Sequence, residues 1–227
     1  HPDGASGCLV ITADKGRPAS YNLNVIREAE ALLADHPATR LFVVGDYGRR
    51  YFTQHSIPIE SSFQYSAKNP TMQKAREICN LLLSEFNAGA VSKIIVIYTD
   101  VKNGLEIETR NVRLIPFHKD YFRTHENERT VTAPFEFRPS VSEVLESIMK
   151  SYISGYIYSA LVDSFCSEQQ ARMTAMDGAN RNAEKLLGEL SAQYNRVRQS
   201  AITMSITEVS AGAKAQKQNS GGRKEEQ

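Results

Sequence analysis

The chain has 227 residues, enough for one globular domain with an extension or for two small domains. Its 27 basic and 26 acidic side chains nearly cancel, which disfavours a nucleic-acid partner because such proteins carry a basic surface. Cys8, Cys79 and Cys166 are widely spaced and suit reduced thiols better than a disulfide framework. The longest apolar runs are far too short to cross a bilayer, so we expect no membrane insertion.

The first part of the chain alternates predicted strands and helices. Apolar runs rich in β-branched residues, typical of strands buried on both faces, lie at Cys8–Ala13, Arg40–Gly45 and Lys93–Thr99. Helical periodicity separates them at Asn24–Ala34, Tyr47–His55 and Met72–Asn87. We expect the alternating stretch Glu106–Phe117 to pair antiparallel at one edge. This order predicts the α/β class, with a small, mostly parallel, Rossmann-like sheet in a globular domain over residues 1–133.

A linker and one very long helix are predicted for residues 134–213. Ser140 is the expected N-cap, and Glu143 completes a capping box with it. No proline follows as far as Ala213, so an unbroken helix would have about 74 residues and a length of roughly 110 Å. The polar residues 214–227 are expected to be a disordered tail.

Apolar and small side chains recur along this helix at alternating spacings of three and four residues. They are Met173, Met176, Asn180, Ala183, Leu187, Leu190, Tyr194, Val197 and Ala201, and we call them the seam. Such a period favours a left-handed coiled coil, in which each seam side chain fits between residues of a partner helix. No second long helix is predicted in this sequence, so the helix is expected to form half of a coiled coil.

The same helix carries short motifs that resemble a known family. They are Arg172-Met173-Thr174-Ala175-Met176, Tyr194-Asn195, Arg198-Gln199, Ala201-Ile202-Thr203 and Ala211-Gly212-Ala213. Leu9-Val10-Ile11-Thr12, Asp14 and Tyr21-Asn22 add a second match near the start. Together these motifs resemble the gamma subunit of F-type ATP synthases, the central rotor stalk. That family begins with another long helix, antiparallel to the last one, and its absence from this sequence leads us to expect a fragment or a processed chain.

The resemblance implies a subunit without catalytic residues, metal or cofactor. Its partners would be the alpha and beta subunits of the catalytic hexamer, the epsilon subunit and the membrane c-ring. The rotor would couple proton-driven rotation to conformational cycling of the beta subunits, at the cytoplasmic face of a bacterial inner membrane. By the same resemblance, Arg172, Arg198, Gln199 and Thr203 would contact the hexamer. Phe135, Phe137 and Arg138 would lie near epsilon and the ring.

Two other functions remain open on the residues alone. Asp14, Asp46 and Asp100 each follow a predicted strand, where open α/β sheets collect ligands, so they could serve a Mg²⁺-dependent phosphoryl-transfer or nucleotide-binding domain. Aspartates after strands more often cap the next helix or turn. An adaptor that dimerises through the seam is the other possibility.

Overall fold

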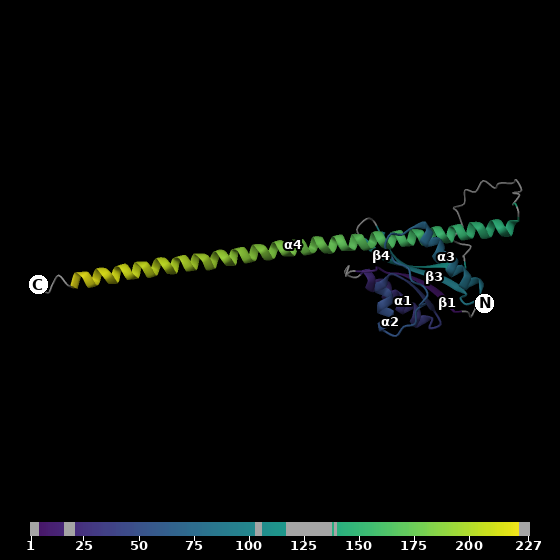
Figure 1. Cartoon of the computed structure of the whole chain (residues 1–227), viewed down its shortest axis with the longest axis horizontal. Coiled ribbons are helices and arrows are strands. Elements are labelled where there is room, and N and C mark those ends of the chain that lie inside the picture. Colours follow the sequence, from purple (N-terminus) through teal and green to yellow (C-terminus); the bar gives the residue numbers. More distant parts are fainter. Residues whose placement is uncertain (1–4, 16–20, 103–105, 117–137, 139, 223–227) are drawn as a thin grey trace. The chain divides into compact units, whose positions relative to one another are not determined.

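The computed structural model describes residues 5–15, 21–102, 106–116, 138 and 140–222 (Figure 1). His1–Ala175 form one compact unit and Met176–Gln227 a second. The boundaries expected at residues 133 and 213 stay a prediction about which segments fold together.

A four-stranded sheet organises the first unit. Its strands are β1 (Ser6–Ile11), β2 (Arg40–Val44), β3 (Lys93–Lys102) and β4 (Glu106–Ile115). Their order is β2-β1-β3-β4, with β1 parallel to β2 and β3, and β4 antiparallel to β3. Every residue of β1 is buried, as a continuous apolar run between two layers requires. The predicted class, a mostly parallel α/β sheet, is therefore confirmed.

Two helices cover one face of the sheet. Helix α1 (Tyr21–Asp35) and helix α2 (Asp46–Gln54) supply Val25, Ile26, Ala29 and Phe52 to this side of the core. The alternate strand residues Cys8, Val10, Leu41, Val43, Ile95 and Ile97 meet them. Because successive strand side chains point to opposite faces, these residues form a core cluster separate from that of the other face.

The other face is covered by α3 (Met72–Asn87) and by the first part of α4 (Val141–Gly222). Figure 1 shows α3 and α4 on the side of the strands opposite α1 and α2. Ile153, Ile157, Ala160 and Leu161 of α4 are at most 3% exposed in this cluster. The start of the long helix is thus a structural part of the α/β core, which then consists of a sheet between two helical layers.

The long predicted helix is confirmed in the structure. The main-chain nitrogen of Glu143 donates to Oγ of Ser140 at 3.2 Å, which is the N-terminal cap that the sequence predicts. Helix α4 continues to Gly222 rather than ending near Ala213. The lysine, alanine and glutamine residues at 214–218 favour a helix, and no proline interrupts the segment. No helix among the described residues is both long and apolar enough to span a membrane.

Gly45 is the single residue that connects β2 to α2, and it packs tightly against the main chain after β1. Gly45 has φ of +92°, and a Cβ placed there would lie 2.2 Å from the main-chain oxygen of Thr12. Its N–H donates to the carbonyl of Tyr65 at 2.9 Å. Only a residue without a side chain fits this conformation and this close approach.

We expect Gly45→Ala to lower the free energy of unfolding by more than about 3 kcal/mol, because strain and a main-chain clash combine. Gly89→Ala is the matched control, since Gly89 also has positive φ, +74°, but nothing lies within 4 Å of its Cβ position. It should cost only about 1–2 kcal/mol. Urea unfolding followed by circular dichroism measures both, and equal losses would contradict the steric argument.

Asp14, which follows β1, holds the loop between α2 and α3 against the carboxyl end of that strand. Its carboxylate accepts bonds from Oγ of Ser66 at 2.5 Å and from the main-chain nitrogens of Ala67, Lys68 and Asp46 at 3.1, 3.3 and 3.3 Å. Burial by itself would raise the pKa of Asp14, but the four donated hydrogen bonds outweigh it and hold the pKa below its ordinary value. The carboxylate therefore stabilises the folded chain in its ionised form.

We expect Asp14→Asn to lower the free energy of unfolding by about 1–3 kcal/mol at neutral pH. Because the pKa is lower in the folded chain, this stabilisation is complete above the unfolded pKa of about 3.9 and is lost as the pH falls through the folded value. The gap between wild type and variant should therefore shrink below about pH 4. Urea titrations from neutral to acidic pH test this, and a gap that stays constant would refute it.

Candidate functional site: the exposed seam of α4

The seam predicted from the sequence lies on one continuous helix. Its large members are exposed to water: Met173 60%, Met176 63%, Leu187 67%, Leu190 60%, Tyr194 68% and Val197 63%. The small or polar members Asn180, Ala183 and Ala201 are exposed as well. Every described side chain from Met173 to Gln216 is exposed, so no part of the seam beyond Met173 is covered by the described chain.

An exposed stripe of this kind is suited to packing against a second apolar surface. In proteins most helix stability comes from tertiary packing of an apolar face rather than from intrinsic propensity. Burying a leucine, methionine or valine side chain contributes about 1.5–3 kcal/mol. Burial of the seam side chains against a second apolar surface would therefore contribute a large favourable free energy.

The same pattern extends towards the start of α4, beyond the residues assigned to the seam from the sequence. Counting back from Met173 by fours and threes reaches Tyr152, Ile148, Leu145 and Val141, which are 45%, 58%, 56% and 61% exposed. The intervening positions hold Gly155, Ser159, Val162, Cys166 and Gln169. The regular spacing itself was the available signal, because it does not change register at Met173.

A second apolar stripe was also missed. Ile202, Ile206 and Val209 are 48%, 64% and 74% exposed and lie four and three residues apart. They belong to a different face from the seam, since none falls in its register. Near its C-terminal end α4 therefore presents apolar side chains in two directions.

The candidates for contact with the hexamer lie in two different settings. Arg198, Gln199 and Thr203 are exposed, and the hydroxyl of Thr203 donates to the carbonyl of Gln199 within the helix at 2.8 Å. In the seam register, Gln199 and Thr203 fall on the side away from the seam and Arg198 beside it. Arg172 instead pairs with Glu168 of the same helix, and its Nη2 lies 3.5 Å from the carbonyl oxygen of Lys15.

The candidates for contact with epsilon and the membrane ring are only partly described. Phe135 and Phe137 lie outside the described residues. Arg138 is described and exposed. The roles of all seven partner-binding candidates stay predictions.

The three aspartates of the enzyme alternative are all engaged in structural bonds. Asp14 accepts the four bonds given above, Asp46 pairs with Arg49, and Oδ2 of Asp100 lies 3.0 Å from Nη2 of Arg110. Within the described ranges no three His, Cys, Asp or Glu side chains are grouped so as to hold a metal ion. Asp14 therefore caps main-chain N–H groups at the start of α2 and in the loop before α3. Asp46 and Asp100 hold ion pairs instead, and Asp100 lies within β3 rather than after it as the sequence predicted.

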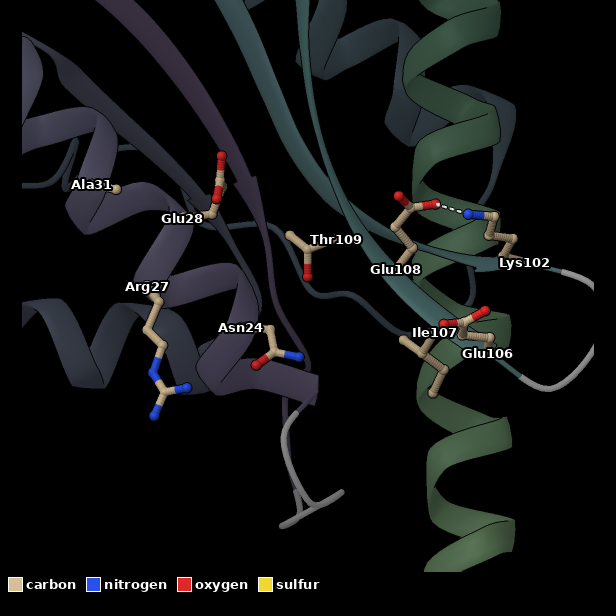
Figure 2. A pocket seen from close by; sticks show the side chains of 9 residues that line it. All are labelled: Asn24, Arg27, Glu28, Ala31, Lys102, Glu106, Ile107, Glu108 and Thr109. Carbon is tan, nitrogen blue, oxygen red and sulfur yellow. Dashed lines mark ion pairs between the residues drawn. The ribbon is translucent and has the colours of Figure 1, made fainter.

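A polar groove of about 580 Å³ lies between α1 and the β3–β4 hairpin (Figure 2). Lys102 and Glu108 form an ion pair across 3.8 Å on the hairpin side, while Arg27 extends from α1 on the other side. Glu106 and Glu28 add acidic groups of the same open surface. An open groove with charges of both signs is typical of a solvated surface rather than of a catalytic pocket.

Comparisons with known proteins agree with this geometry. A family model described as ATP synthase matches residues 1–216. The ATP synthase gamma chain of Caldanaerobacter subterraneus subsp. tengcongensis is 39% identical over 213 residues, covering 90% of this chain and 72% of the relative. That of Ruminiclostridium cellulolyticum is 36% identical over 210 residues, covering 91% and 71%.

Two solved structures share the fold. The central stalk and c-ring of Tetrahymena thermophila mitochondrial ATP synthase contain a chain with a TM-score of 0.59 and 23% identity, with 78% of this chain and 76% of that chain covered. Euglena gracilis mitochondrial ATP synthase contains one with a TM-score of 0.64 and 15% identity, with coverage of 94% and 73%. The family match and the bacterial relatives establish that this chain belongs to the ATP synthase gamma chain family, the non-catalytic rotor of the central stalk.

Proposed function

We propose that α4 acts as the shaft surface of this rotor through two kinds of contact, the seam with a second helix and the other exposed faces with the alpha and beta subunits. The observation that carries the proposal is the exposure of the whole seam on a continuous helix. Apolar side chains at alternating spacings of three and four are suited to knobs-into-holes packing. The small members Asn180 and Ala183 suit close approach and a fixed register.

Contact with the hexamer would use the polar and apolar groups near the C-terminal end of α4. Arg198 and Gln199 are long side chains with several hydrogen-bond donors, and both are exposed. Ile202, Ile206 and Val209 add an apolar stripe close to them in sequence. Because these groups lie on different faces of one helix, the surface is asymmetric about the helix axis.

Such asymmetry is what rotary coupling needs. A shaft that contacts each beta subunit differently stabilises a different conformation of each one, and turning the shaft shifts those preferences in sequence. The coupling is reciprocal, since a change of beta conformation driven by ATP must in turn favour one angle of the shaft. The chain itself would make or break no covalent bond.

The remaining proposed partners are the epsilon subunit and the membrane c-ring. Phe135, Phe137 and Arg138 would contact the epsilon subunit and the membrane c-ring, which would place the complex at the cytoplasmic face of a bacterial inner membrane. Support comes from the family and from the exposure of Arg138. Crosslinking from a cysteine at position 138 to epsilon or ring subunits tests this placement.

We expect Arg198→Ala or Gln199→Ala to reduce coupled ATP hydrolysis about fivefold in the assembled ATP synthase that contains this chain, because each truncation removes donors from a buried contact. Folding should be unchanged, since both residues are exposed in the free chain. Arg181→Ala is the matched control, because the Arg181 guanidinium already pairs with Asp177 of the same helix. Wild-type turnover in both variants, with normal assembly, would count against contact at these positions.

We expect Leu187→Lys to reduce incorporation into the complex at least about tenfold. A lysine at the centre of a coiled-coil seam would bury its charge without an opposite charge to pair with. The chain alone should keep its helix content, since Leu187 is 67% exposed there. Leu187→Met, which keeps an apolar side chain of similar volume at the same seam position, is the matched control and should assemble normally. Co-purification with alpha and beta subunits measures incorporation. Equal incorporation of the two variants would contradict the seam as an interface.

A further inference from the structure

Near the carboxyl end of the inner strand β3, Thr99 lies beyond the last residue that pairs with β1. Strand β1 ends at Ile11, and the last residue of β3 that pairs with β1 is Ile97. Two residues further along β3, Thr99 points its N–H and C=O to the same side as Ile97, where β1 has ended. Thr99 is fully buried, so both groups need partners within the protein.

Helix α4 supplies both partners. Oγ of Ser164 accepts a hydrogen bond from the main-chain nitrogen of Thr99 at 3.3 Å, and Oγ of Ser167 donates to its carbonyl oxygen at 3.2 Å. The two serines are one helical turn apart and are 2% and 0% exposed. One residue of β3 is therefore held on both its main-chain groups by one face of α4.

A third bond reaches the same turn from the opposite helical layer. The hydroxyl of Tyr21, the first residue of α1, donates to the carbonyl oxygen of Ser164 at 3.0 Å. Burial raises the pKa of Tyr21, which keeps its hydroxyl protonated as a donor. Ser164 thus bonds to β3 through its side chain and to α1 through its main chain.

These hydrogen bonds are directional, whereas the neighbouring apolar contacts are not. Ile153, Ile157 and Leu161 hold α4 on the sheet by burial, which is non-directional and changes little when a helix turns slightly about its axis. Hydrogen bonds weaken steeply once the donor and acceptor are misaligned. The serine contacts therefore fix the angle of α4 about its own axis relative to the sheet.

We propose that Ser164 and Ser167 form a clasp on Thr99 that transmits torque between the α/β core and α4. The inference rests on the rotor function of the chain. A shaft under load experiences a turning force about its axis, and resistance to that force depends on contacts that are sensitive to the angle of the helix. Ser164 and Ser167 act as positioning residues, since they touch neither nucleotide nor coupling ion.

The chain offers a matched control within the same helix. Ser154 is also buried, at 4% exposure, but its hydroxyl donates at 2.7 Å to the carbonyl of Lys150, one turn earlier in α4. Ser154→Ala removes a buried serine hydroxyl without removing a bond between α4 and the sheet. It therefore separates a general loss of stability from a loss of the clasp.

The first measurement concerns the contact itself. Amide hydrogen exchange in the chain should be at least about tenfold faster at Thr99 in the Ser164→Ala/Ser167→Ala variant, because the donor loses its acceptor. Ser154→Ala should leave exchange at Thr99 unchanged. Wild-type protection of Thr99 in the double variant would show that no clasp exists, and this result does not depend on the rotor function.

The second measurement concerns torque. ATP synthase containing each variant is reconstituted into liposomes, and ATP hydrolysis without a gradient and the largest ion gradient pumped by ATP are both recorded. The double variant should hydrolyse ATP near the wild-type rate without load but sustain a gradient at least about twofold smaller, while Ser154→Ala sustains the wild-type gradient. If the double variant does not assemble, Ser164→Ala alone replaces it, since it removes the acceptor of the Thr99 N–H while Ser167 still bonds the Thr99 carbonyl.

Two outcomes would overturn the proposal. A wild-type gradient in the variant with accelerated exchange at Thr99 would show that the clasp carries no torque. An equal decrease in Ser154→Ala would assign the effect to stability alone. Failure of the proposed contacts at Arg198 and Gln199 would appear instead as normal hydrolysis in those variants, so the two ideas are tested separately.

Discussion

The unpaired apolar face of α4 is the feature on which the rest of this chain depends. The first part of the helix has two apolar sides: Ile153, Ile157 and Leu161 are buried on the sheet, whereas Val141, Leu145 and Ile148 remain in water. The α/β core therefore satisfies only one side of its own helix. An exposed apolar stripe of this regularity is typical of an interaction surface.

The same helix explains why a Rossmann-like sheet need not bind a nucleotide here. In open α/β sheets, ligands collect at the carboxyl ends of the strands, where the strand order changes direction. In this chain that position lies between β1 and β3, and Ser164 and Ser167 of α4 occupy it by bonding Thr99. Asp14, the acidic residue that follows β1, holds the loop that precedes α3. The α/β fold thus holds α4 in place, which agrees with a non-catalytic subunit.

A second carboxyl group, that of Glu168, is buried close to Asp14. Glu168 is 5% exposed and pairs with Arg172, one turn further along α4. Burial raises the pKa of Glu168, and nearby Asp14 raises it further, while Arg172 opposes both effects. Arg172 therefore has a structural role at the core in addition to any contact with the hexamer, and a variant at this position would change both.

The sequence by itself determined the elements and the seam. Apolar runs located the strands, helical periodicity located α1, α2 and α3 to within a few residues, and the Ser140–Glu143 pair located the start of α4. These features depend on residues close together in the chain, so local spacing is enough to predict them. The family resemblance also followed from local motifs along α4, and the relatives confirm it.

Only the tertiary structure decided which face of α4 meets the sheet. Nothing in the local pattern distinguishes Ile153 and Ile157, which are buried, from Ile148 and Tyr152, which are exposed. The bonds of Ser164 and Ser167 to Thr99 join residues more than sixty positions apart, and the four bonds to Asp14 join three separate segments. Such contacts depend on how the elements are stacked, and a helical period fixes only which residues share a face, never what that face touches.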